Sequence, residues 1–312
     1  MKLVKQLLLN PLSLFGIILL LFFGLVAIFA PWLAPPPNPY EPYRIAQFGY
    51  SPTPKPPTGS NPLSEIWKLV TRQSDFSTTH PFGTTEGQYD VYYGIVWGTR
   101  TAFLAGILIT GITALIGIIW GSVAAYFGSW LDIVFMRITD IFQAFPFLIA
   151  AMTIACVLQP KIGRSIYTAA LALVVFGWMG YARLIRGDIL SIKERDYVQA
   201  ARALGASHLR IVLRHILPNA IYPTLVVASM DIGSYVISFA ALSFFGLGAE
   251  VGFADWGQML SFARNWIPRL NQYWWIILYP GLALILFVLA WNLVGDALRD
   301  ILDPRLRGRI TV

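Results

Sequence analysis

The chain has 312 residues, of which 56% are hydrophobic and only 12% are charged, and its formal net charge is +7. Soluble globular domains carry about 25% charged residues, so this composition excludes an ordinary soluble fold and indicates a membrane protein. The basic residues lie in short segments beside apolar runs, which favours contact with anionic lipid over nucleic-acid binding.

Six apolar segments are long enough to cross a bilayer, for which about 20 residues are needed. The first follows Lys2 and Lys5, as in a signal peptide, but it lacks a convincing cleavage site and is interpreted as a membrane anchor. The sequence therefore predicts an all-α polytopic membrane protein with six transmembrane helices. They are expected at residues 12–30, 101–126, 141–158, 166–182, 220–242 and 274–294.

The distribution of lysine and arginine predicts the orientation of these spans. An even number of spans places both termini on one side, and the short segments on that side carry most of the basic residues. The richest of them are residues 183–214 and 299–309. We therefore expect both termini to be cytoplasmic.

This topology divides the chain into four regions. Residues 1–34 form a cytoplasmic start and the first helix, and residues 35–100 form a proline-rich extracytoplasmic loop with a segment that leads into the second span. Residues 101–298 form a five-helix core that includes a cytoplasmic loop at 183–219. Residues 299–312 form a basic cytoplasmic tail.

The two long extracytoplasmic loops differ in composition. Residues 35–62 are rich in proline and are expected to be extended, and residues 63–72 could form a short amphipathic helix. The segment HPFGT at 80–84 is typical of a turn and leads through Asp90 into the second span. Residues 243–273 are rich in glycine and tryptophan. These tryptophans suit the membrane interface, and a partner-binding surface is the alternative.

Residues 196–218, DYVQAARALGASHLRIVLRHILP, are predicted to form two short helices. Asp196 and Ser207 can cap these helices, Gly205 suits the left-handed residue that ends the first, and Pro218 is expected to stop the second. Small alanines beside a glycine would let another protein approach closely, and the arginines could pair with its carboxylates. The alternative is a basic amphipathic hairpin lying on anionic lipid, and these residues alone leave both possibilities open.

Motifs for catalysis and for cofactor binding are missing from the sequence. It contains no G-x-x-x-x-G-K-[ST] phosphate loop, no H-E-x-x-H and no G-x-S-x-G pattern, so an enzyme is not expected. Cys156 is the only cysteine, and the three histidines are too scattered to suggest a metal site. We therefore expect neither a metal nor a cofactor to be bound by this chain.

Asp231 is the one acidic residue well inside a predicted span. A carboxylate at that depth is expensive and usually faces the interior of a helix bundle or an aqueous path. A structural hydrogen bond to a neighbouring helix and a role in translocation remain open. The candidate residues of a translocation path are Asp231, Ser234 and Ser238.

The segment at 196–218 resembles the EAA loop of ABC-importer permeases. In that family, Glu-Ala-Ala is followed by three residues, glycine, nine residues and an apolar stretch ending in Leu-Pro. Here Gln199-Ala200-Ala201 precedes Gly205, and His215-Ile216-Leu217-Pro218 closes the pattern. The flanking residues resemble the peptide-transporter branch, and segments at 80–90, 128–140, 242–257 and 292–305 resemble other family motifs in the same order.

The sequence also departs from the family pattern in four places. Gln199 replaces the usual glutamate, and the insert at 35–79 is longer than expected. Residues 85–89 differ from the usual acidic-leucine-glycine-arginine run, and Phe239 stands where many relatives carry glutamate.

The resemblance implies an inner-membrane permease subunit of an ABC importer for dipeptides or oligopeptides, of the second-permease type, working by alternating access. It implies a second homologous permease, two cytoplasmic ATPase subunits that hold ATP and Mg²⁺, and an extracytoplasmic binding protein, all acting at the lipid bilayer without nucleic acid. The residues that would couple to the ATPases are Tyr197, Gln199, Ala200, Ala201, Arg202, Gly205, Arg210, His215 and Pro218.

Three alternative functions remain open. The same architecture could import nickel, glutathione or another small solute. A stand-alone secondary transporter or channel would need coupling-ion or filter residues within the spans, which are scarce apart from Asp231. A membrane scaffold could instead recruit a soluble partner through the hairpin.

Overall fold

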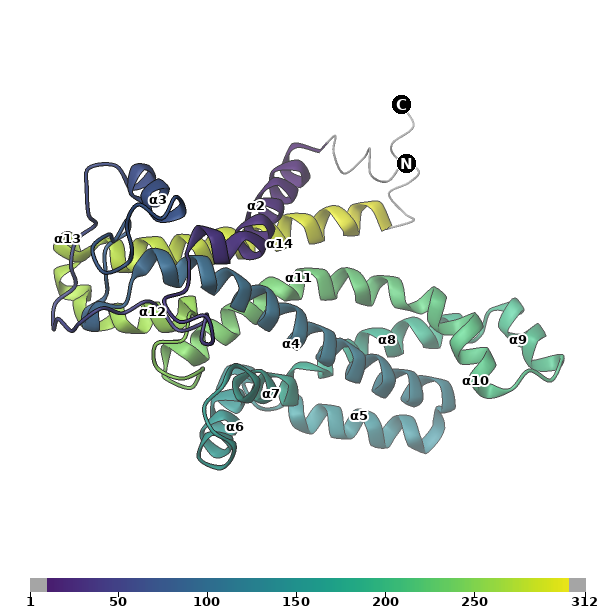
Figure 1. The fold of residues 1–312 in the computed structure, drawn as a ribbon. Helices are drawn as coiled ribbons and strands as arrows, with labels where there is room; N and C mark the ends of the chain where they lie inside the picture. The colour runs from purple at the N-terminus through teal and green to yellow at the C-terminus, as the bar shows by residue number, and fades with distance from the viewer. Residues whose placement is uncertain (1–9, 303–312) are drawn as a thin grey trace.

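The computed structural model of the protein describes residues 10–302, and within that range it consists of helices, loops and isolated β-bridges, without β-strands. Long helices run side by side along the molecule (Figure 1). We call the end that carries α9 and α10 the hairpin end and the end that carries α3 and α12 the insert end. Lys2, Lys5 and the greater part of the predicted basic tail, residues 303–312, lie outside the described residues.

Four helices of the described range are long and apolar enough to span a membrane singly. Two further helix pairs pass only when each bent pair is counted as one span, which brings the total to the predicted six. The four single spans are α2 (Pro11–Leu33), α4 (Val91–Phe127), the continuous helix His208–Phe244, and α14 (Trp275–Leu302). The bent pairs are α5 (Ser129–Gln143) with α6 (Phe147–Ile162), and α7 (Ile166–Gly177) with α8 (Met179–Ile192).

The third predicted span, residues 141–158, is wrong as a single helix. α5 ends before Pro146, α6 begins after it, and the two helices are bent by 84°. Proline disfavours a helical conformation at the residue before it, so the helix breaks there. Residues 129–140, which belong to one of the segments that resemble family motifs, form most of α5.

The fourth predicted span also differs from the structure, because α7 and α8 meet at Trp178 with a bend of 41° and α8 continues past residue 182 to Ile192. The extra turns carry Ile185 and Ile189, which are buried, and Arg186, which pairs with another helix. Tertiary contacts thus support helix where the apolar run has already ended.

The segment 196–218 begins as predicted, with two short helices around a glycine. α9 (Asp196–Ala203) and α10 (His208–Ile211) are joined through Gly205, whose φ of 77° is the expected left-handed value. The predicted caps are wrong in detail. Asp196 is already the first residue of α9, and Ser207 precedes α10 without a side-chain hydrogen bond.

Pro218 does not stop the second helix, which is a further correction. α10 continues through a π-helical turn, η2 (Val212–Ile216), directly into α11 (Leu217–Phe244). The Leu217 N–H donates to the Val212 carbonyl, five residues earlier. This wider turn leaves room for the proline ring, and Pro218 lies in the first turn of α11, where its missing N–H is tolerated.

α4 is the central helix of the bundle and packs against α8, α11, α7 and α2. Its closest contact is with α8, because a Cβ placed on Gly121 would lie only 2.2 Å from the Ala182 carbonyl oxygen. Glycine at this position therefore lets two backbones touch. α14 packs against α11 and α2 and completes the bundle.

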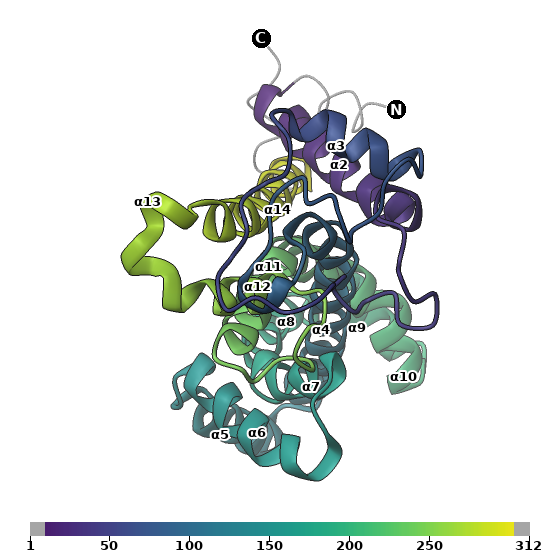
Figure 2. The same cartoon turned by 60° about the vertical axis from the view of Figure 1, so that its left-hand side comes forward.

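The loops at the insert end follow the prediction closely. α3 (Pro62–Val70) is the expected short amphipathic helix, and residues 35–61 contain no helix. The loop after α11 contains α12 (Trp256–Ala263), η3 (Arg264–Arg269) and α13 (Leu270–Tyr273). Figure 2, turned toward this end, shows α3 lying along α2.

Candidate functional site

The hairpin, residues 196–218, is anchored to the bundle by a small apolar core. Val198, Ile211 and Ile216 are buried, and they share a cluster with Tyr126 of α4 and Ile189 of α8. Burial of such side chains stabilises an element by about 1.5–3 kcal/mol each. The hairpin therefore sits on the ends of α4 and α8 as part of one packed body.

Polar contacts strengthen this junction. The Tyr126 hydroxyl lies 2.8 Å from His208 Nδ1, and Lys193 Nζ donates to the Ala125 carbonyl at 3.1 Å. Gln199 Nε2 donates to the Lys193 carbonyl at 3.2 Å, which closes the turn between α8 and α9. A glutamate carboxylate could not donate this hydrogen bond, so the departure at Gln199 has a local structural reason.

The outer surface of the hairpin is uncovered. Gly205 is open, since no atom of the described chain lies within 4 Å of a Cβ placed on it. Among the other predicted coupling residues, Ala201 and His215 are half-buried. The exposed ones are Tyr197, Gln199, Ala200, Arg202, Gly205, Arg210 and Pro218.

Sequence reasoning missed the leucines of this surface. Leu204, Leu209 and Leu213 are 88%, 69% and 55% exposed. Large apolar side chains that remain exposed outside the spans predicted from the sequence, beside arginines, are typical of a protein contact. The sequence did contain a signal for this surface, namely leucines within a segment predicted to lie outside the membrane.

Two ion pairs connect α5 to α8 near the hairpin end. Arg186 binds Asp132 through two hydrogen bonds of 2.6 Å each, from Nε and Nη2, and Arg183 binds Asp140. The two-pronged contact matches the planar guanidinium to the carboxylate. These pairs join residues that are more than forty positions apart, and the sequence alone did not predict them.

Asp231 has a specific partner on a neighbouring helix. The Tyr181 hydroxyl of α8 donates to Asp231 Oδ2 at 2.6 Å, and the carboxylate is half-buried. Ser234 is exposed and Ser238 is partly exposed at helical spacing from Asp231, so the three predicted path residues share a side of α11. The arrangement is compatible with both the structural and the translocation hypothesis.

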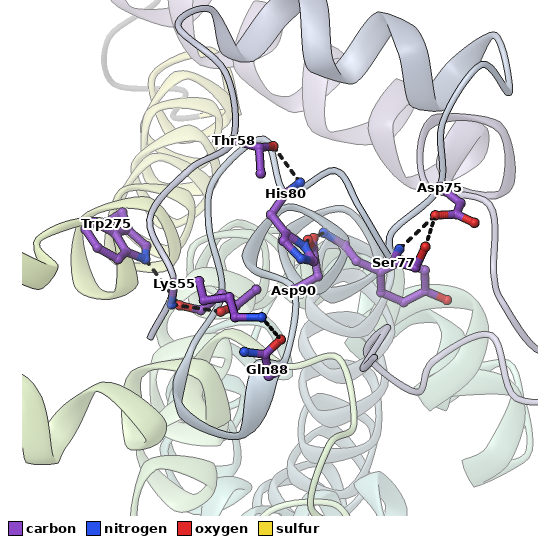
Figure 3. A network of polar contacts seen from close by, with 10 residues as sticks. Lys55, Thr58, Asp75, Ser77, His80, Gln88, Asp90 and Trp275 are labelled. Atoms are coloured by element: carbon purple, nitrogen blue, oxygen red, sulfur yellow. Dashed lines mark hydrogen bonds and ion pairs between the residues drawn. The ribbon is translucent and has the colours of Figure 1, made fainter. Parts of the chain in front are cut away.

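A polar network organises the insert end (Figure 3). Asp90 caps α4 by accepting the Tyr93 N–H at 2.8 Å, and its other oxygen lies 2.9 Å from His80 Nδ1. The turn predicted at 80–84 is present, with Gly83 donating to the His80 carbonyl at 3.0 Å. Burial raises the pKa of the Asp90 carboxyl, and the His80 contact opposes that shift.

The same network joins the insert to the core. Lys55 Nζ donates to Gln88 at 2.9 Å, and Trp275 at the start of α14 donates to the Thr84 carbonyl at 3.2 Å. An open pocket of about 720 Å³ lies between Pro35 and the loop that follows α3, remote in sequence from Asp231. The described residues contain no cluster of metal-ligating side chains.

The chain matches a known protein family. Residues 114–308, more than half of the chain, match the family described as binding-protein-dependent transport system inner membrane component. The chain belongs to this family. Residues 2–57 of the permease also match the N-terminal transmembrane domain of oligopeptide transport permease C. The family is one of transport permeases rather than enzymes, and its members are multi-pass proteins of the inner membrane.

Several curated relatives are similar to the permease over most of its length. A dipeptide transport system permease, DppC, of Alkalihalophilus pseudofirmus is 34% identical over 97% of this chain and 89% of its own. The oligopeptide permease OppC of Bacillus subtilis is 32% identical over 96% and 87%. A glutathione transport permease, GsiD, of Pectobacterium atrosepticum is 37% identical over 74% of each chain.

Solved structures support the fold. The MetNI methionine ABC transporter in inward-facing conformations matches with a TM-score of 0.56 at 19% identity, covering 68% of the permease and 97% of the matched chain. A second crystal form of the same transporter matches with a TM-score of 0.54. The helical arrangement is therefore that of an ABC-transporter permease.

Proposed function

We propose that this permease is a translocating subunit of an ABC importer that carries dipeptides or oligopeptides across the inner membrane. The named dipeptide and oligopeptide permeases among its relatives support this substrate class. The observation that carries the coupling part is the hairpin, whose inner side is packed on α4 and α8 and whose outer side exposes leucines and arginines.

In this proposal the hairpin faces the cytoplasm and docks on a separate ATPase subunit. The chain contains no phosphate loop, so ATP and Mg²⁺ would be held by two partner ATPases. A second homologous permease would complete the translocation pathway, and an extracytoplasmic binding protein would deliver the substrate. The exposed Leu204 and Leu209 would enter a cleft of the ATPase, with Arg202 and Arg210 pairing at its edge.

The packing suggests how ATPase movement would reach the membrane. Since Tyr126, Ile189 and Ile216 belong to one apolar cluster, displacement of the hairpin would shift α4, α8 and the start of α11 together. Rigid displacement of packed helices is a common route to alternating access. The Asp132–Arg186 pair would carry α5 along.

Asp231, Ser234 and Ser238 are proposed to line the translocation path. Asp231, held by Tyr181, would interact with the positively charged end of a peptide, and Ser234 and Ser238 would supply hydroxyls along the same side of α11. In proteoliposomes that contain the assembled importer, Asp231→Asn should lower peptide uptake and keep the melting temperature. A lower melting temperature with normal uptake would make the carboxylate structural.

Glutathione import is the second candidate, because GsiD is 37% identical over a shorter part of the chain. Glutathione is itself a small peptide, so the two candidates differ in the substrate and share the mechanism. A panel of dipeptides, longer peptides and glutathione, tested for stimulation of ATP hydrolysis by the reconstituted importer, separates them.

The coupling proposal is tested by Gly205→Glu in proteoliposomes that contain both permeases, the ATPases and the binding protein. The variant adds a long charged side chain to the docking surface. Because Gly205 has a left-handed φ of 77°, any other residue at this position also adds about 1 kcal/mol of backbone strain. We expect at least about a tenfold loss of peptide uptake, equivalent to about 1.4 kcal/mol of docking free energy.

Gly163→Glu is the matched control. Gly163 has a similar φ of 84°, its Cβ position is equally open, and it lies between α6 and α7, outside the hairpin. With ψ 167°, the Gly163 backbone lies in a region that only glycine normally occupies, so this variant carries at least as much backbone strain as Gly205→Glu, and it should nevertheless retain uptake. Normal uptake by Gly205→Glu, with a correctly assembled complex, would refute the coupling role of the hairpin.

A further inference from the structure

The helix of the insert, α3, has three distinct sides. Its inner side carries Glu65 and Leu69, which are 7% and 2% exposed and face the rest of the chain. On one flank, Leu63 and Trp67 are four residues apart, one turn of helix, and are 75% and 64% exposed.

The side of α3 next to this apolar flank is polar. Ser64 and Lys68 are exposed there, again one helical turn apart, and Lys68 Nζ pairs with Glu65 at 2.8 Å. A helix that only covers the protein would need one apolar side and one polar side. The second, uncovered apolar flank of α3 is therefore unexplained by packing within the described chain.

The position of α3 indicates what covers this flank. α3 packs against α2, and both views show it beside α2 at the insert end (Figures 1 and 2). α2 is a candidate span with only 17% of its most apolar window buried, so most of its surface is available to lipid. Near the end of α2, Ile28 and Trp32 are 70% and 68% exposed. α3 therefore lies beside a helix most of whose surface is open to lipid.

The residue types fit the boundary between lipid and water. Tryptophan is enriched at this boundary because its ring is apolar and its N–H can still reach water, and Trp32 and Trp67 are both exposed. Lysine places its charge at the headgroups while its stem covers apolar surface. An interfacial helix carries this division, with an apolar flank toward the acyl chains and a polar flank toward water.

We infer that α3 is an interfacial helix, which places Leu63 and Trp67 in the headgroup region of the bilayer on the insert side. The partner of this surface is phospholipid, and the insert rests on the membrane beside α2. The inference is independent of the transported substrate and of the ATPase contact. It assigns a role to the insert at residues 35–79.

The test uses site-specific cysteine labelling, which is simple here because the chain has only one native cysteine. Cys156→Ser removes it, and a single cysteine is then placed at Trp67 on the apolar flank or at Ser64 on the polar flank as the matched control. Both side chains are exposed, so labelling with an environment-sensitive fluorophore leaves the packing of α3 unchanged. The labelled permease is reconstituted in phosphatidylcholine vesicles that contain nitroxide-labelled lipid.

An interfacial helix buries its apolar flank to a depth of about 5–10 Å, so the nitroxide is placed high on the acyl chain. We expect the probe at 67 to have blue-shifted emission and to be quenched by the lipid nitroxide, whereas the probe at 64 is quenched by aqueous iodide. Equal iodide quenching of both probes would overturn the inference. Protection of the probe at 67 only after addition of the binding protein would overturn it too, because the flank would then be a protein contact.

Discussion

Two buried carboxylates, Asp90 and Asp255, begin helices at the insert end and differ in how they are satisfied. Asp90 accepts a backbone N–H and contacts His80. Asp255 accepts the Gly257 N–H at 3.0 Å through one oxygen, and its other oxygen has no hydrogen-bond partner within the described chain. Burial raises the pKa of Asp255 to about 6. The cap therefore favours the protonated acid at mildly acidic pH.

The sign of the resulting pH dependence follows from proton binding. Between the unfolded pKa of 3.8 and the native pKa of about 6, the native state binds more protons, so raising the pH through this window destabilises it. The loss amounts to at most about 3 kcal/mol. Asp255→Asn keeps an acceptor for the cap and removes the titration.

The check is the melting temperature of both proteins from pH 4 to pH 7 in the same detergent. The difference between Asp255→Asn and the wild type should grow in favour of the variant as the pH rises toward about 6 and then stay constant. Parallel profiles would show that Asp255 does not titrate in this range.

At the scale of elements, the clearest feature is the connection of α5 to α8. α5 packs on α4, and the Asp132–Arg186 and Asp140–Arg183 pairs hold it against α8. The Asp132 and Arg186 side chains are only 18% and 32% exposed, so solvent screens this pair weakly. Since α8 leads directly into the hairpin, this pair is positioned to keep α5 in step with it.

Arg186→Gln should destabilise the permease by about 2 kcal/mol, because it leaves the Asp132 carboxylate partly buried without its charged partner. Adding Asp132→Asn should restore part of that loss, since no unpaired charge remains. The measurement is the melting temperature of the single and double variants.

Arg137→Gln provides the control for this prediction. Its contact with Asp140 is long, at 4.0 Å, and its side chain is 78% exposed, so the variant should change stability by less than about 0.5 kcal/mol. Equal effects of Arg137→Gln and Arg186→Gln would contradict the role assigned to the Asp132–Arg186 pair.

At the scale of the whole molecule, the hairpin and the insert lie at opposite ends of the long helices (Figure 1). Basic residues are concentrated in residues 183–214, which include the hairpin. This distribution predicts that the hairpin end is cytoplasmic. The proposed contacts with ATPases at one end and with a binding protein at the other both depend on this orientation.

Cysteine labelling in a Cys156→Ser background checks the orientation. Tyr40 and Leu204 are 95% and 88% exposed at the two ends, so a cysteine at either position is open to reagent. In spheroplasts, whose inner membrane is intact, a membrane-impermeant maleimide should label Tyr40→Cys. Leu204→Cys should react only after the membrane is permeabilised. The reverse pattern would invert the topology and remove the hairpin from the ATPase side.

Local features were predictable from the sequence because each depends on nearby residues. The apolar runs located most of the spans, Gly205 indicated its left-handed turn, and the turn at 80–84 and the short helix α3 followed from their own residues. The effect of each proline could not be predicted from its neighbours in the sequence. Pro146 breaks a predicted span, whereas Pro218 is accommodated in the first turn of α11, directly after a π-helical turn.

What only the tertiary structure decided are the contacts between distant residues. Arg186 finds Asp132 from 54 positions away, and Tyr181 finds Asp231 from 50. The backbone contact at Gly121 brings α4 and α8 close together and so sets which side chains meet. Hydrophobic length and charge are properties of a segment, so they are written in the sequence. Pairing depends on the geometry of helices packed together, which no single segment contains.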